Sequence, residues 1–167
     1  MTAERRVLVV YYSRTGNTER VARDLAARLD ADLEKINDEA KRSGFLGYIS
    51  AVYDSVRNVA AVIAEPQKDS ADYSITVVGT PVWAGRMTPA VRGYLERTAG
   101  RARALAFFVT SGNTDAGKIV PAMEAIAGGK AIAFTGFNDS ELKNPAAYEN
   151  KLAALIEPLK NRAHTAV

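Results

Sequence analysis

Short apolar runs recur along this chain, and a segment with helical spacing follows each of them. The first run, VLVVYY at residues 7–12, is continuous, as in a strand that is buried on both faces. Further runs with strand character lie at residues 31–36, 73–80, 104–110 and 130–137. This alternation predicts parallel strands joined by right-handed crossovers, with helices on both faces of the sheet. The expected fold class is therefore α/β, with five strands.

The segments between these runs carry helix signals. Apolar residues spaced by three and four predict helices over residues 18–29 and 45–63. Thr88-Pro89 has the sequence of an N-cap followed by a proline at the first helical position. Because proline belongs in a first turn, Pro121 predicts that the next helix begins near Ile119. A last helix is expected at the C-terminal end of the chain.

Length and composition favour one globular domain. The chain has 167 residues, 47% hydrophobic and 25% charged, so we expect a single domain over residues 1–167, with its core at about 5–160. The absence of cysteine excludes disulfides, zinc-thiolate sites and a cysteine nucleophile, and His164 is the single histidine. No nucleophile–base pair and no pair of carboxylates stands out. We therefore expect no metal and no catalytic side chain, with the chemistry belonging to a bound cofactor.

The charge and the apolar stretches exclude other classes of protein. A net charge of +3 is too small and too scattered to indicate a nucleic-acid partner. No stretch approaches the roughly 20 apolar residues that a membrane-spanning helix needs. The first apolar run ends too early for the core of a secretory signal, so a cytoplasmic protein is expected.

The segment after the first strand is rich in hydrogen-bond donors. It offers hydroxyls, an amide and successive backbone N–H groups just before a helix, which favours an anion such as phosphate. The alternative is an ordinary capped turn between strand and helix. The candidate phosphate-binding residues are Ser13, Arg14, Thr15, Gly16, Asn17 and Thr18.

Two further loops follow the third and fourth predicted strands. Ligands of open parallel sheets bind beyond the carboxyl ends of such strands. The second loop holds the only tryptophan, which would stack on a planar ring or else fold back over a helix. The third loop is rich in small and hydroxyl residues, which are also common in plain turns. The candidates are Pro81, Val82, Trp83, Ala84 and Gly85 in the second loop, and Thr110, Ser111, Gly112 and Asn113 in the third.

These three loops, in this order, resemble those of the flavodoxin-like FMN-binding family. YYSRTGNT is similar to the family's phosphate loop, GTPVWAG to the loop whose aromatic residue flanks the isoalloxazine ring, and TSGN falls at the third flavin loop. The resemblance covers about residues 5–160. It implies a doubly wound five-stranded parallel sheet of order 2-1-3-4-5, with FMN at the junction of strands one and three. Within it, Trp83 would stack on the ring and residues 110–113 would meet its pyrimidine edge.

Two departures from the family pattern bear on the role. Family electron carriers are acidic, whereas this chain is basic near the second loop, at Arg86, Arg92, Arg97, Arg101 and Arg103. The third loop also lacks the usual tyrosine, which would leave one flavin face open. Two redox roles stay open: a carrier serving a redox partner protein, or an enzyme using NAD(P)H to reduce a small quinone- or flavin-type acceptor. The alternative to both is a flavodoxin-like interaction module without FMN.

Two other classes of α/β protein, a phosphate-loop ATPase and a phosphoreceiver domain, do not match the sequence at key positions. Residues 112–118 fit the pattern G-x-x-x-x-G-K, but Ile119 follows where an ATPase phosphate loop needs Ser or Thr for Mg²⁺. A phosphoreceiver domain would need an aspartate at the end of the third strand, where Gly79-Thr80 stands.

Overall fold

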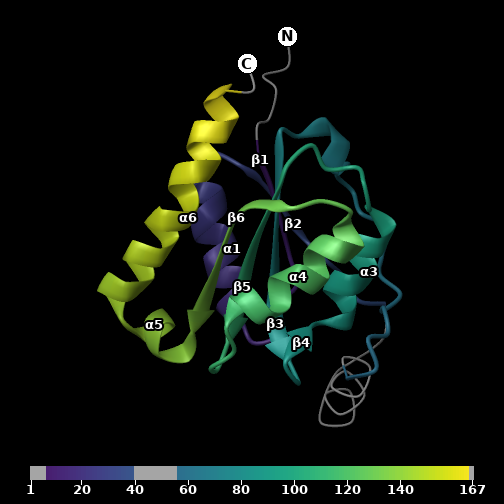
Figure 1. The fold of residues 1–167 in the computed structure, drawn as a ribbon, viewed down its shortest axis with the longest axis horizontal. Coiled ribbons are helices and arrows are strands. Elements are labelled where there is room, and N and C mark those ends of the chain that lie inside the picture. Colours follow the sequence, from purple (N-terminus) through teal and green to yellow (C-terminus); the bar gives the residue numbers. More distant parts are fainter. Residues whose placement is uncertain (1–6, 40–55, 166–167) are drawn as a thin grey trace.

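A computed structural model describes residues 7–39 and 56–165 of the chain (Figure 1). Five parallel strands form the sheet in the order β2-β1-β3-β5-β6. Their bounds are β1 Val7–Tyr11, β2 Asp32–Lys35, β3 Ile75–Trp83, β5 Leu105–Ser111 and β6 Ala131–Asn138. A short sixth strand, β4 (Arg86–Met87), pairs antiparallel with the end of β3. The predicted order 2-1-3-4-5 is confirmed, since β5 and β6 are its fourth and fifth parallel strands.

Helices cover both faces of this sheet (Figure 1). Helices α1 (Asn17–Leu29), α5 (Asp139–Lys143) and α6 (Pro145–Thr165) pack on one face, and α3 (Pro89–Arg97) and α4 (Ala116–Ala127) on the other. A single 3-10 turn, η1 (Ser70–Asp72), precedes β3. No helix among the described residues is long and apolar enough to cross a membrane.

Each face of the sheet has its own hydrophobic core. Every residue of β1 is buried, as its continuous apolar sequence predicts for a strand covered on both faces. Val9 packs on the side of α1 and α6, whereas Leu8 packs on the side of α3 and α4. This two-sided burial matches the position of β1 inside the sheet, where it pairs with β2 on one side and with β3 on the other.

The predicted helix over residues 45–63 is wrong in its described part, and its remainder, residues 45–55, lies outside the described residues. From residue 57 on the chain is turn and extended, and Ile63 forms an antiparallel bridge with Asp38. The backbone N–H of Ala61 donates to Pro89 O at 2.9 Å, at the start of α3. Spacing by three and four was misleading here, because Val59 and Val62 are exposed β-branched residues that suit an extended chain.

One helix boundary and one whole helix also differ from the sequence-based expectation. Helix α4 begins at Ala116, not near Ile119, because the Asp115 side chain accepts a hydrogen bond from Gly117 N at 2.8 Å and caps it there. Pro121 therefore lies inside the helix. Helix α5 was not predicted at all. It begins with a capping box between Asn138 and Glu141, two residues that are close in sequence.

Candidate functional site

The three loops singled out in the sequence follow β1, β3 and β5, which are neighbours in the sheet. Parallel strands place all three loops at the same carboxyl edge. The Thr18 and Thr110 hydroxyls lie 2.8 Å apart in the protein interior and join the first loop to the third. The rings of Tyr12 and Trp83 lie 5.7 Å apart and join the first loop to the second. The structure therefore brings the three predicted segments together.

The first loop is a tight turn that leads directly into α1. The Ser13 side chain is buried, and its hydroxyl accepts a hydrogen bond from Gly16 N at 3.1 Å. Gly16 has a φ of 100°, a left-handed conformation that glycine adopts without strain. Between these two residues, Arg14 and Thr15 are exposed, and Asn17 follows as the first residue of the helix.

The N-terminus of α1 has no side-chain cap. Asp115 caps α4 and Asn138 caps α5, whereas α3, like α1, has no side-chain cap and begins with Pro89. The first N–H groups of a helix have no intrahelical partner, and they carry the positive end of the helix dipole. An anion placed in the turn would satisfy them. The donor set thus fits a phosphate group, and that the turn binds one stays a prediction.

The second loop is a β-hairpin, which corrects the expectation of an irregular loop from Pro81 onward. Strand β3 continues through Trp83, and Val82 pairs with Met87 of β4. The two residues of the turn, Ala84 and Gly85, have positive φ values of 49° and 71°. Positive φ at both positions is typical of the two-residue turns that match the twist of a hairpin.

Buried hydroxyls fix the base of this hairpin. The Thr80 hydroxyl donates to Pro81 O at 2.8 Å and accepts from Thr88 N at 3.2 Å. Both threonine side chains are fully buried. Polar groups buried with their hydrogen bonds satisfied hold a local geometry firmly. The position of Trp83 at the tip is thus set by the strand pairing and by Thr80.

Tyr12 is a site residue that the sequence analysis did not select. It follows β1 directly, is half-buried, and meets the half-buried Trp83 ring edge-on, with an angle of 84° between the ring planes. The signal in the sequence is the aromatic residue that stands between the buried strand and the proposed phosphate turn. Tyr12 packs edge-on against Trp83 at the same end of the site, and the expectation of one open flavin face stays a prediction.

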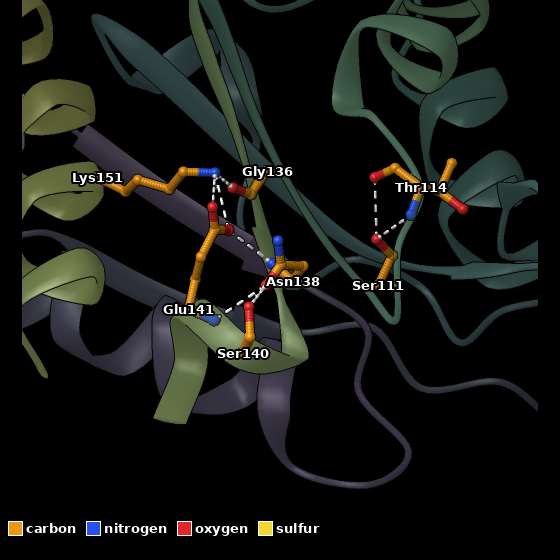
Figure 2. Close-up of polar contacts among 7 residues, drawn as sticks. All are labelled: Ser111, Thr114, Gly136, Asn138, Ser140, Glu141 and Lys151. Atoms are coloured by element: carbon orange, nitrogen blue, oxygen red, sulfur yellow. Dashed lines mark hydrogen bonds and ion pairs between the residues drawn. The ribbon is translucent and has the colours of Figure 1, made fainter. Parts of the chain in front are cut away.

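The third loop is held at its base and exposed at its tip. Ser111 ends β5, and its hydroxyl donates to Thr114 O and accepts from Thr114 N, both at 2.9 Å (Figure 2). Gly112 and Asn113 are exposed between them, and Thr110 is buried beside Thr18. Residues 112–118 carry no phosphate loop of the ATPase kind, because Asp115 and Gly117 form the cap of α4.

A charged network lies across a pocket from the third loop, and no sequence motif had indicated it. The pocket has a volume of about 380 Å³ and is lined by Asn113 and Thr114 on one side and by Glu141 and Lys151 on the other. Lys151 Nζ donates to Gly136 O at 2.6 Å and pairs with the Glu141 carboxylate at 2.8 Å (Figure 2). These partners come from β6, α5 and α6, so only the folded chain brings them together.

The network also sets the charge state of Glu141. Burial would raise the pKa of this carboxyl group, but the Asn138 backbone N–H and the Lys151 ammonium outweigh it, so the pKa of Glu141 lies below its ordinary value. The Glu141 carboxylate accepts from Asn138 N at 2.9 Å, and Asn138 Oδ1 accepts from Glu141 N at 2.9 Å. The ionised carboxylate thereby fixes the end of β6 beside the third loop.

The chain belongs to the Flavodoxin family, whose model matches residues 6–158. In fold it is similar to a flavoprotein from Lactobacillus acidophilus solved in complex with FMN. The TM-score is 0.69 at 21% identity, covering 85% of this chain and 99% of that one. The apo-form of the Lactobacillus flavoprotein gives a TM-score of 0.61 at 21% identity, covering 84% and 96%.

A flavodoxin from the domain Archaea is also similar in fold. It has a TM-score of 0.58 at 13% identity, covering 94% of this chain and 98% of that one. A search of curated proteins found no match. At these identities the solved structures establish the shared fold, and the family model establishes the membership.

Proposed function

We propose that this protein binds FMN non-covalently and works as an FMN-dependent redox protein. The observation that carries the proposal is the uncapped N-terminus of α1, which opens onto the carboxyl edge where Thr18 bonds to Thr110. Membership of the Flavodoxin family supports FMN as the cofactor. The FMN complex of the Lactobacillus flavoprotein, which shares the fold, supports it further.

Different segments of the chain would contact different parts of the cofactor. In the proposal, the turn at residues 13–18 binds the phosphate through backbone N–H and hydroxyl groups, and Arg14 adds positive charge. Trp83 stacks on the isoalloxazine ring, Tyr12 supports Trp83 edge-on, and residues 110–113 meet the pyrimidine edge of the flavin. When bound, FMN supplies the electron-transfer chemistry, and the protein contributes orientation and tuning of the ring's surroundings.

Of the two redox roles, reduction of a small acceptor at the expense of NAD(P)H is the one we favour. The hairpin that carries Trp83 also carries Arg86, and Arg92 and Lys118 line the same pocket as Arg86. Positive charge beside the ring suits a small anionic substrate and would repel a basic partner protein. Steady oxidation of NADPH with a quinone would support the enzyme, whereas FMN binding without turnover would favour a carrier.

The first experiment is an absorbance spectrum of the purified protein, followed by FMN titration. Trp83 is the only tryptophan, so quenching of its fluorescence reports on the ring position directly. Saturation at one FMN per chain supports the proposal. A lack of any flavin band and of quenching would refute both redox roles and leave the interaction module.

The phosphate assignment is tested by Thr15→Ala combined with Asn17→Ala. Loss of two donors that bond to a charged group should weaken FMN binding by roughly a hundred-fold, taking about 1.4 kcal/mol for each. The matched control is Asn161→Ala with Thr165→Ala, which removes the same groups from the exposed far end of α6. Equal affinity in both double variants would remove the phosphate from this turn.

A further inference from the structure

Three cationic side chains from separate elements line one pocket beside the hairpin. Arg86 comes from β4, Arg92 from α3 and Lys118 from α4, and the pocket between them has a volume of about 300 Å³. Asn58 and Gly85 also line this pocket. The pocket therefore opens at the tip of the hairpin that holds Trp83.

The two arginines converge on a single neutral oxygen. Arg86 Nη1 donates to Asn58 Oδ1 at 2.9 Å, and Arg92 Nη2 donates to the same oxygen at 3.3 Å. Two guanidinium groups held this close repel each other, and an amide oxygen offsets the repulsion far less than an anion does. Two guanidinium groups that donate to one point could bind an oxyanion there. In this structure the Asn58 amide oxygen accepts both hydrogen bonds.

The charge in the pocket is only partly balanced. Within residues 7–39 and 56–165, the single ion pair made by the three cations joins Arg92 to Glu96 at 3.7 Å, and the Glu96 side chain is half exposed. Asp115 lies in the turn before Lys118, and its carboxylate is engaged as the cap of α4. Counted over the described residues, the charge on the wall of this pocket is therefore net positive.

The location of the pocket connects it to the ring site. Trp83 and Arg86 are paired residues across the hairpin, and such pairs present their side chains on the same face. Lys118 lies in the first turn of α4, immediately after the third loop. A small molecule with an anionic group in this pocket would extend toward the aromatic end of the proposed flavin site.

We propose that Arg86, Arg92 and Lys118 bind the phosphate monoester of the small-molecule redox substrate. The inference rests on the proposed FMN-dependent function and names the substrate class for it. A phosphate monoester carries close to two negative charges near neutral pH and several acceptor oxygens, which two guanidinium groups and an ammonium complement. Two substrates offer this chemistry: a nicotinamide dinucleotide with a 2′-phosphate, and free FMN arriving as an acceptor.

The test measures binding by calorimetry, independently of turnover. The FMN-loaded protein is titrated with adenosine 2′,5′-bisphosphate and, for comparison, with adenosine, which has no phosphate group. Arg86→Gln and Lys118→Gln alter exposed side chains, and each should weaken binding of the bisphosphate about ten-fold. Arg103→Gln is the matched control, because Arg103 is exposed at the opposite edge of the sheet, just before β5. It should leave the affinity unchanged.

Separate arms identify the source of the phosphate. A preference for NADPH over NADH that disappears in Arg86→Gln assigns the pocket to the dinucleotide. Binding of a second FMN that is lost in the same variant assigns it to a flavin acceptor. Equal affinity of wild-type and variant proteins for every phosphate probe would overturn the inference, while leaving FMN binding at residues 13–18 intact.

Two further outcomes separate this inference from the proposed function. If Arg86→Gln weakens binding of the first FMN as strongly as it weakens binding of the bisphosphate, the pocket belongs to the cofactor, and the substrate assignment is overturned. If the wild-type protein binds no FMN at all, the proposed function and the substrate assignment both fall, whatever its affinity for the bisphosphate.

Discussion

Thr18 and Thr110 stand 92 positions apart in the sequence, yet their hydroxyl oxygens lie 2.8 Å apart in the interior. At the scale of single residues, this bond joins the turn proposed for phosphate to the loop proposed for the flavin edge. Ser13, Thr80 and Ser111 act in a similar way within their own loops, because each hydroxyl bonds to backbone groups of its turn. The candidate site is thus preorganised by short polar side chains.

Thr18→Val should destabilise the protein by about 1–3 kcal/mol, because it leaves the buried Thr110 hydroxyl without its partner. Urea unfolding followed by circular dichroism measures the change in the free energy of unfolding. Thr110→Val should cost a similar amount, and the double variant should cost less than the sum, since it removes both polar groups together. Strict additivity of the two single changes would show that the bond contributes nothing to stability.

At the scale of elements, apolar patterning predicted all five parallel strands, and the family resemblance predicted their order, which the structure confirms. It misled where backbone pairing from elsewhere in the chain decides the conformation. Residues 59–63 have helical spacing, but Ala61 bonds to Pro89 O, and Ile63 bridges to Asp38. The hairpin after β3 was missed because the signal of Ala84-Gly85 is only a dipeptide, and its positive φ values appear only in the structure.

The candidate site divides in the same way. The loops could be predicted because the phosphate-binding and ring-flanking motifs are local runs of sequence. The contact between Tyr12 and Trp83 and the pairing of Lys151 with Glu141 could not, because each depends on elements that meet only after folding. Sequence reasoning thus selected three segments that do meet in the structure, and it missed the side chains that support them. Their role in binding stays a prediction.

Gly79→Ala should destabilise the protein by about 1–3 kcal/mol through overpacking. A Cβ atom at position 79 of β3 would lie 2.0 Å from the ring of Phe108 on the neighbouring strand β5. Thermal unfolding measures the loss. Gly112→Ala is the control, because the nearest atom to its Cβ, Asp139 Oδ2, would be at an ordinary distance of 3.9 Å. Similar stabilities of the two variants would contradict the close packing of β3 on β5.

The pairing of Lys151 with Glu141 predicts a specific acid sensitivity. Because the folded-state pKa of Glu141 is lowered, its contribution to stability is present above the unfolded pKa of about 4.3 and is lost as the pH falls through the folded pKa. Wild-type stability should therefore fall more steeply below about pH 4.3 than the stability of Glu141→Gln. Lys151→Met should flatten the profile as well, since it removes a cause of the shift. Parallel profiles for all three proteins, measured by urea unfolding from pH 3 to 7, would be the contrary result.

At the scale of the whole molecule, the candidate site lies at the edge of the sheet where β1, β3 and β5 end and where α1 and α4 begin. The two hydrophobic cores meet across β1, β3 and β5, so the position of each loop is set by strands that are buried on both sides. Both hydrophobic cores are built from side chains of the chain itself. Cofactor binding should therefore add stability to a chain that is already folded.

FMN in excess should raise the unfolding temperature of the protein. At a free concentration of about one hundred times Kd, ligand binding contributes about 2.7 kcal/mol, which for a chain of this size corresponds to roughly 5–10 °C. Riboflavin, which lacks the phosphate, should give a much smaller shift at the same concentration if residues 13–18 bind that group. Equal shifts with both compounds would place the binding free energy in the ring contacts alone.

The bond between Thr18 and Thr110 also suggests how the molecule could be divided. Strands β1 and β2 with α1 carry the proposed phosphate turn, whereas the chain from β3 onward carries the hairpin and the third loop. A break in the connection between β2 and β3 would separate the two halves of the site, and neither fragment would hold it complete. Fragments fused to two interacting proteins would then reconstitute the site on association, and flavin binding would serve as the signal of a split reporter.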